Sequence, residues 1–175
     1  GYLKRIWQIC KKYDVLYISD EVVTGFGRMG HFFSSKEVFG IVPDIITCAK
    51  GITSGYMPLG AVLFSDKLLN DIKKESALFF HGYTYSGHPA CCAAALKNIE
   101  IIKRDKILQH VKEIEPYFHE KLKNLYELPI VGDVRGKGLM AGIECVINKD
   151  SKEALILYKA IGSRIDEESI KLGLI

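Results

Sequence analysis

Two charged residues of opposite sign, Asp20 and Lys50, directly follow short apolar runs, and their side chains can take part in proton transfer and covalent chemistry. Asp20 follows the run 15–19 and Lys50 follows the run 45–49, both of which have the length and composition of buried strands. Ligands of open α/β sheets bind in the crevice outside the carboxyl ends of the strands. The spacing therefore predicts a carboxylate and an amine at one crevice, although a structural ion pair or two unrelated loop charges would produce the same pattern.

The neighbours of Lys50 favour a covalent role for its amine. A lysine amine can act as a nucleophile toward a carbonyl group and form a Schiff base. Ala49 and Gly51 are small, so a planar ligand has room to reach the amine. Pyridoxal phosphate is the cofactor that combines a lysine Schiff base with a carboxylate partner for its pyridinium nitrogen. With Asp20 as that partner, the pair predicts this cofactor.

The elements that must position these residues follow from apolar periodicity. The pattern predicts strands over residues 15–19, 45–49, 60–65, 130–134 and 139–146. It predicts helices over residues 1–13, 35–39 with a serine N-cap, 66–75, 90–104, 107–125 and 152–171. Pro116 lies inside one of these helices and predicts a kink or break there.

The lengths of the connections predict a mixed sheet. About 25 residues separate the first two strands, which is enough for a crossover between parallel neighbours. Only a ten-residue gap precedes the strand at 60–65, so we expect that strand to be antiparallel. The near-continuous apolar runs indicate a mostly parallel sheet flanked by helices, the α/β class, followed from about residue 105 by part of a small α+β domain.

Composition excludes several classes of protein. The 175 residues are 48% hydrophobic and 26% charged with a net charge of +3, which favours a globular chain and argues against a nucleic-acid or membrane partner. The five cysteines show no metal-ligand spacing and no disulfide framework, so we expect no metal and a reducing, cytoplasmic compartment. Both ends interrupt a pattern, which suggests an internal piece of a longer protein.

Four ordered segments resemble class III aminotransferases, the pyridoxal-phosphate enzymes of fold type I. Together they cover about 120 residues. The segments are DEVVTGFGRMG at 20–30, AKGITSGYMPLGA at 49–61, HGYTYSGHP at 81–89 and GDVRGKGLM at 132–140. The resemblance implies that residues 1–104 are the C-terminal portion of the cofactor-binding large domain and that residues 105–175 are part of the small domain.

The resemblance also implies roles for individual residues. Lys50 would form the Schiff base with pyridoxal phosphate and later shuttle the proton, while Asp20 would pair with the pyridine nitrogen. Val22 would pack on the cofactor ring. Thr84 would bind the cofactor phosphate in the neighbouring subunit of a homodimer. For Glu21, pairing with a substrate-binding arginine and a solvated strand-end charge both stay open.

The implied reaction moves an amino group from an ω-amine or ω-amino acid to a keto acid such as pyruvate. An aminomutase or decarboxylase of the same fold, or an inactive fragment serving only dimerisation, are the alternatives; the loop 85–89 favours the transaminase. The isolated chain is expected to be inactive, because the family's phosphate loop, ring-stacking aromatic residue and substrate arginine lie outside it.

Gly25–Gly30 matches the glycine spacing of a dinucleotide-binding fingerprint. Five residues separate it from the preceding strand and no long helix follows, so we do not expect a dinucleotide site there.

Overall fold

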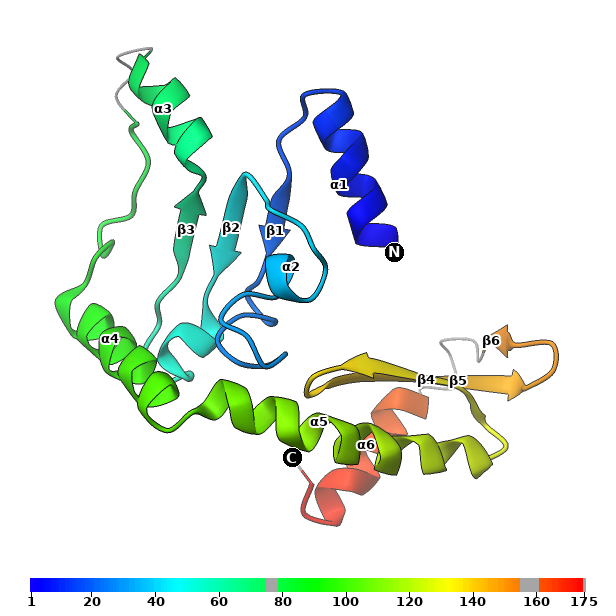
Figure 1. The fold of residues 1–175 in the computed structure, drawn as a ribbon. Coiled ribbons are helices and arrows are strands. Elements are labelled where there is room, and N and C mark those ends of the chain that lie inside the picture. The colour runs from blue at the N-terminus through cyan, green and yellow to red at the C-terminus, as the bar shows by residue number, and fades with distance from the viewer. Residues whose placement is uncertain (75–78, 155–160, 175) are drawn as a thin grey trace. The chain divides into compact units, whose positions relative to one another are not determined.

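The computed structural model describes residues 1–74, 79–154 and 161–174, which fall into two compact units (Figure 1). Unit 1 is Gly1–Ile114 and unit 2 is Glu115–Ile175. The boundary between the units lies inside helix α5 (Ile107–Lys123). The assignment of 1–104 and 105–175 to a large and a small domain stays a prediction, and each unit is described by itself.

Unit 1 contains a three-stranded mixed sheet in the order β1-β2-β3, which Figure 1 shows in blue to green. Strand β1 (Ile18–Asp20) is parallel to β2 (Ile45–Cys48). Strand β3 (Ala61–Phe64) is antiparallel to β2. The antiparallel direction expected from the ten-residue gap is therefore confirmed.

The first strand begins later than the expected residue 15. Residues 15 and 16 are exposed, and the pairing with β2 starts only at Ile18. The reason is Asp44, a buried residue whose carboxylate accepts hydrogen bonds from the Tyr17 N–H and from Lys11 Nζ, both at 2.9 Å. Asp44 therefore fixes the backbone at Tyr17, just before β1. Through Lys11 it also links this segment to helix α1 (Tyr2–Lys12).

The remaining helices of unit 1 are α2 (Ser34–Glu37), the 3₁₀ helix η1 (Lys50–Thr53), α3 (Asp66–Lys74) and α4 (Pro89–Arg104). Among them, α2, α3 and α4 lie where helices were predicted, whereas η1 was not predicted. The predicted serine N-cap of α2 is wrong, because Phe33 occupies that position without a side-chain cap. The hydroxyl groups of Ser34 and Ser35 instead donate hydrogen bonds to the carboxylate of Glu21.

A small core lies where η1 meets β2 and α4. Cys48, Ile52 and Ala95 are its buried members. Four partly buried side chains pack against them: Phe26, Phe33, Leu59 and Ala61. Burial of an aliphatic side chain such as that of Ile52 contributes roughly 1.5–3 kcal/mol, so the turn that begins with Lys50 is attached to the core.

Unit 2 consists of the end of α5 and a hairpin sheet. The elements after α5 are η2 (Asn124–Glu127), β4 (Val131–Lys137), β5 (Met140–Asn148), β6 (Glu153–Ala154) and α6 (Ile161–Lys171), and the antiparallel sheet has the order β4-β5-β6. The predicted helix over 152–171 is wrong at 153–154, which form β6, while 155–160 lie outside the described residues. Helix α5 continues through Pro116, so of the predicted kink or break the break is wrong and the kink stays a prediction.

The hairpin β4–β5 is held to α5 by two polar contacts. His119 Nε2 lies 2.9 Å from the carbonyl oxygen of Gly138, and Lys137 Nζ lies 2.9 Å from a carboxylate oxygen of Glu115. At Gly136 the strands approach so closely that an added Cβ would lie 2.2 Å from the carbonyl oxygen of Met140. This close approach explains why glycine occupies position 136.

We predict that Gly136→Ala lowers the free energy of unfolding by about 1–3 kcal/mol, because the new methyl group forces the hairpin apart. Gly142→Ala is the matched control on the same hairpin, since its Cβ would meet only the flexible side chain of Arg135 at 3.8 Å. Melting temperatures of the purified variants test this. Equal melting temperatures for both variants would contradict the close approach at Gly136.

Candidate active site

Asp20 is the last residue of β1 and its carboxylate is exposed at the strand's carboxyl end. The backbone N–H of Val22 donates to Asp20 Oδ1 at 2.9 Å. Across residues 1–74, 79–154 and 161–174, this N–H is the only hydrogen-bond or ion-pair partner of the carboxylate. The other oxygen can therefore accept a hydrogen bond from a ligand, and the half-buried side chain of Val22 stands two residues away.

Lys50 leaves the carboxyl end of β2 and starts η1 with a left-handed backbone, φ 41°. Its side chain is exposed, and Nζ has neither a hydrogen bond nor an ion pair within the described part of the chain. Asp20 pairs with Thr47 in the parallel register, so Asp20 and Lys50 leave the same edge of the sheet from adjacent strands. Adjacent strands lie about 4.8 Å apart. The structure therefore places both residues at the edge that the sequence predicts.

The loop after β1 packs closely against the turn after β2. A Cβ added to Gly51 would lie 3.0 Å from Phe26 Cβ and 3.1 Å from the carbonyl oxygen of Gly25. Phe26 is also left-handed, with φ 58°. Non-glycine residues in this region cost about 1–2 kcal/mol each. The glycine beside Lys50 thus serves this close approach as well as ligand access.

Two further residues fix the turn that carries Lys50, and sequence reasoning missed both. Thr53 is buried, and its hydroxyl donates to the carbonyl oxygen of Met57 at 2.6 Å. Asn98 of α4 donates from Nδ2 to the carbonyl oxygens of Gly51 and Ile52. No periodicity signals a hydrogen bond across 46 or 47 residues, so only the structure could find Asn98.

Glu21 excludes one of the two alternatives left open by the sequence, the solvated charge, while its pairing with a substrate-binding arginine, which the resemblance places outside this chain, stays a prediction. Its side chain is 1% exposed, so it is not a solvated charge. One carboxylate oxygen accepts from the Thr24 hydroxyl and from the N–H and hydroxyl of Ser34, and the other accepts from the N–H and hydroxyl of Ser35. These five bonds span 2.5–3.0 Å and involve no arginine. Glu21 is therefore a buried structural anion that closes the glycine-rich loop.

The same hydrogen bonds set the acidity of Glu21. Burial alone would raise the pKa of its carboxyl group. The hydrogen bonds from Ser35, Thr24 and Ser34 outweigh burial and lower the pKa below its ordinary value of 4.5. Glu21 is consequently ionised at neutral pH, where hydrogen bonds from uncharged donors stabilise its charge.

Thr84 is not brought to Asp20 or Lys50 by the contacts of this chain. It lies in an exposed turn at 84–87, where Ser86 Oγ accepts from the Tyr83 N–H at 2.9 Å. Within the described residues no hydrogen bond joins Thr84 to Asp20, Val22 or Lys50. Its predicted role in binding phosphate, and the roles of the other three residues, stay predictions.

Hollows on unit 1 do not add a competing site. A cavity of about 740 Å³ is lined by apolar residues such as Phe32 and Leu63 and by charged ones such as Lys36, and neither Asp20 nor Lys50 lines it. Where the chain is described, no group of three or more histidine, cysteine, aspartate or glutamate side chains could hold a metal ion. The helices in that part are also too short or too polar to cross a membrane.

Solved structures similar to this chain place its fold in a class of protein, the fold type I pyridoxal-phosphate enzymes. A solved (S)-enantioselective omega-transaminase from Thermomicrobium roseum superposes with a TM-score of 0.92 at 43% identity, covering 100% of this chain and 39% of that one. An aminotransferase from Vibrio fluvialis, solved in its PMP-bound form, has a TM-score of 0.90 at 37% identity, covering 100% and 39%.

The chain belongs to the class-III aminotransferases, whose family profile matches residues 1–168. It is 42% identical to the putrescine–pyruvate aminotransferase of Pseudomonas aeruginosa over 99% of this chain and 38% of that protein. It is 48% identical to a probable aminotransferase of Mycobacterium tuberculosis over 87% of this chain and 33% of that protein. The chain thus spans about a third of the length of these curated relatives.

Class-III aminotransferases depend on pyridoxal phosphate, and the residues present fit that cofactor. A primary amine without a partner suits the cofactor aldehyde, and a carboxylate with a free oxygen suits a protonated ring nitrogen. Both groups lie at one sheet edge beside the apolar side chain of Val22. The chemistry of the amine, the carboxylate and the apolar side chain is therefore compatible with the cofactor.

We predict that Glu21→Gln destabilises the fold by roughly 2 kcal/mol at neutral pH, because an amide nitrogen faces the donors of Ser34 or Ser35. Since the folded pKa lies below 4.5, ionised Glu21 stabilises the fold above about pH 4.5, and this stability is lost as the pH falls through the folded pKa. The melting-temperature gap between wild type and Glu21→Gln should therefore narrow in acid.

The exposed Glu37, on the neighbouring helix α2, provides the control. Glu37→Gln should match wild type at every pH. A gap for Glu21→Gln that keeps its size from pH 7 to pH 3 would rule out a stabilising carboxylate at position 21.

Proposed function

We propose that this chain supplies the reactive lysine and its aspartate partner to a pyridoxal-phosphate-dependent aminotransferase. The observation that carries the proposal is the placement of the unpartnered Lys50 amine and the half-free Asp20 carboxylate at the ends of adjacent parallel strands. Membership of the class-III family supports the same reaction. The chain's coverage of its relatives indicates that it acts with the remainder of a longer protein.

The cofactor, when bound, supplies an aldehyde and an electron-withdrawing ring. In this proposal Lys50 binds the aldehyde carbon and later, as a free amine, moves the proton between the carbons of the substrate and the cofactor. Asp20 holds the proton on the ring nitrogen, which sustains electron withdrawal. Val22 covers one face of the ring, and Thr84 binds the phosphate group of the neighbouring subunit's cofactor.

The proposed substrates are an ω-amine or ω-amino acid as donor and a keto acid such as pyruvate as acceptor. Two relatives support this choice by name, the putrescine–pyruvate aminotransferase and the omega-transaminase. An aminomutase or decarboxylase of the same fold is the second candidate. The sequence Tyr-Ser-Gly-His-Pro at 85–89 favours the transaminase over it.

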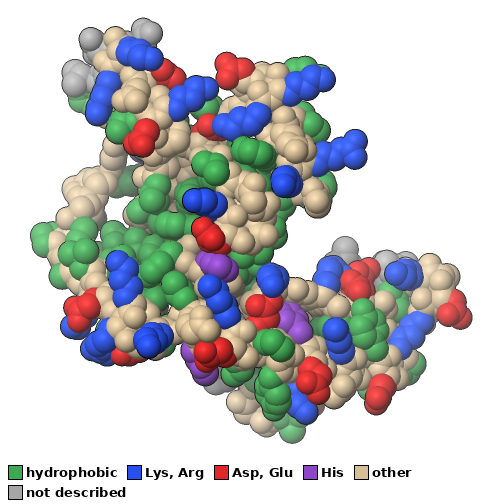
Figure 2. Space-filling model, viewed as in Figure 1, with side chains coloured by type: hydrophobic (Ala, Val, Ile, Leu, Met, Phe, Trp, Pro, Cys, Tyr) green, Lys and Arg blue, Asp and Glu red, His purple; other side chains and the backbone are tan. Residues whose placement is uncertain are grey.

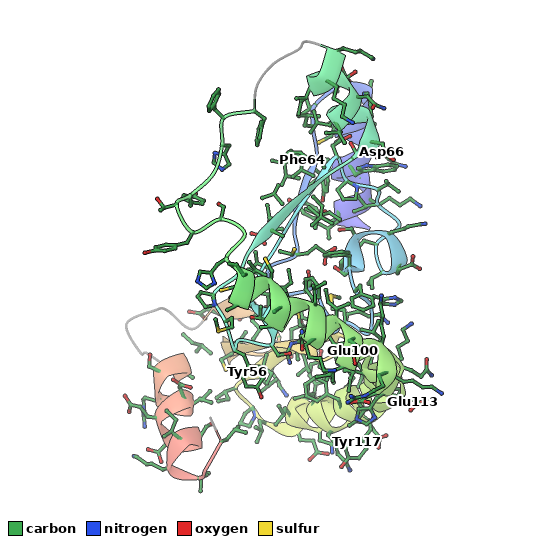
Figure 3. The ribbon with its side chains drawn as sticks, turned by 90° about the vertical axis from the view of Figure 1, so that its left-hand side faces the viewer. Tyr56, Phe64, Asp66, Glu100, Glu113 and Tyr117 are labelled. Carbon is green, nitrogen blue, oxygen red and sulfur yellow. The ribbon has the colours of Figure 1, made fainter. Side chains whose placement is uncertain are left out.

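A homodimer is part of the proposal, and exposed aromatic side chains support it. Segment 79–88 contains no helix or strand, and its ring side chains project outward (Figure 3). Phe80 is 92% exposed, Tyr85 81% and Tyr83 79%. Figure 2 shows further hydrophobic side chains gathered over β3 and the start of α4. Exposed aromatic side chains of this kind are typical of a protein interface.

Two weaker proposals concern the chain itself. All five cysteines are free, which supports a cytoplasmic, reducing compartment. The exposed site supports the view that residues 1–175 alone neither retain the cofactor nor turn over. A stable cofactor absorbance band in the purified 175-residue chain would contradict the second proposal.

We predict that Lys50→Ala abolishes transamination in the complete protein, because alanine has no amine to attack the cofactor aldehyde. The measurement is transfer of an amino group from an ω-amine to pyruvate, together with the absorbance of the bound cofactor. Lys73→Ala, at an exposed position of α3, is the control and should retain full activity. Retained activity and absorbance in Lys50→Ala would refute the assignment.

We predict that Asp20→Asn keeps part of the bound cofactor but lowers kcat by about 10²–10⁴-fold, since an amide cannot hold the ring nitrogen protonated. Asp14→Asn serves as control, because Asp14 is exposed with φ 51° and asparagine tolerates that conformation. Steady-state kinetics and cofactor titration measure the two effects. A near-normal rate in Asp20→Asn would count against its role.

A further inference from the structure

The side chain of Asn98, on helix α4, makes three hydrogen bonds to the turn that carries Lys50. Its Nδ2 donates to the carbonyl oxygens of Gly51 at 2.9 Å and of Ile52 at 3.1 Å. Its Oδ1 accepts a hydrogen bond from Ser54 Oγ at 2.7 Å. Both polar ends of the Asn98 side chain are thus engaged with residues that follow Lys50 directly in the chain.

The backbone of this turn requires such support. Lys50 and Ser54 bracket η1 with left-handed φ angles of 41° and 50°, which non-glycine residues rarely adopt. The final carbonyl groups of a short helix also lack partners within the helix. The Asn98 amide supplies a partner for the Ile52 carbonyl oxygen and a second one for that of Gly51, which also accepts from the Ser54 N–H at 3.2 Å, so it favours the conformation that holds Lys50 left-handed.

We propose that Asn98 is a positioning residue for Lys50. Without the amide donors, the turn relaxes toward ordinary right-handed angles, which redirects the Cα–Cβ bond of Lys50 and moves its amine relative to Asp20. The inference deepens the proposed function and rests on it. It concerns the position of the amine rather than its chemistry, because Asn98 contacts only the turn.

The core contacts of the turn separate this role from simple stabilisation. Ile52 and Thr53 are buried and keep η1 attached to the sheet and to α4. Loss of the Asn98 hydrogen bonds therefore changes the conformation at Lys50 more than it changes folding. Helix α4 also begins directly after the turn of Thr84, so it joins the lysine turn to the predicted phosphate-binding loop through one rigid element.

The test uses Asn98→Asp in the complete protein, with Lys97→Ala on the exposed side of α4 as control. The aspartate keeps the shape of the side chain and can still accept from Ser54, but it cannot donate to Gly51 or Ile52. Ser54→Ala removes only the third hydrogen bond and should have a smaller effect in the same direction. Melting temperature of the cofactor-free form reports folding.

The first readout does not depend on turnover. Cofactor-free protein is mixed with pyridoxal phosphate, and the covalent adduct between Lys50 and the cofactor aldehyde, which forms with loss of water, is fixed by borohydride reduction. Mass spectrometry of the Lys50 peptide then gives the rate of capture. We expect capture about tenfold slower in Asn98→Asp, and kcat lower by about 10–100-fold with KM changed less than about threefold.

The outcomes are distinct. Slow capture and low kcat in Asn98→Asp, with Lys97→Ala like wild type and a melting temperature that stays well above the assay temperature, support the inference. Normal capture and kcat in Asn98→Asp overturn it, whatever the melting temperature. Absence of the Lys50 adduct in wild type overturns the proposed function itself and the inference with it.

Discussion

The parallel pairing of β1 with β2 is the interaction on which the rest of the site depends. It brings Asp20 opposite Thr47, and the Glu21 N–H extends the pairing by donating to the Thr47 carbonyl oxygen at 2.8 Å. Because both strands run the same way, their carboxyl ends emerge at one edge. An antiparallel partner would have carried the lysine to the opposite edge, where β3 ends with Phe64 paired to Ile45.

Two side chains that take no part in the proposed chemistry hold the two loops of this edge. The Glu21 carboxylate accepts hydrogen bonds from hydroxyl and N–H groups that follow β1. The Asn98 side chain makes hydrogen bonds to the carbonyl oxygens and the hydroxyl group of the turn after β2. Glu21 therefore acts as a hydrogen-bond acceptor, whereas Asn98 acts mainly as a hydrogen-bond donor. The two loops then meet at Gly51, where only glycine leaves room for Phe26.

The sequence was sufficient for the features that depend on local pattern. Apolar runs located the strands that end near Asp20 and Lys50, and the ten-residue gap predicted the antiparallel β3. Features that depend on distant partners could not be predicted, because no periodicity links Glu21 to two serines 13 and 14 residues away. The late start of β1 has the same cause, since Asp44 binds the N–H of Tyr17 across 27 residues.

The left-handed backbone at Lys50 follows from competing demands on one residue. The residue must end β2, begin a tight return toward the antiparallel β3, and keep its side chain in the solvent at the sheet edge. A right-handed backbone conformation at Lys50 would continue into a longer helix and would point the lysine side chain in a different direction. Glycine would adopt the conformation freely but has no amine. A strained lysine, stabilised by Ile52 in the core and by Asn98 from α4, is the arrangement that satisfies all three demands.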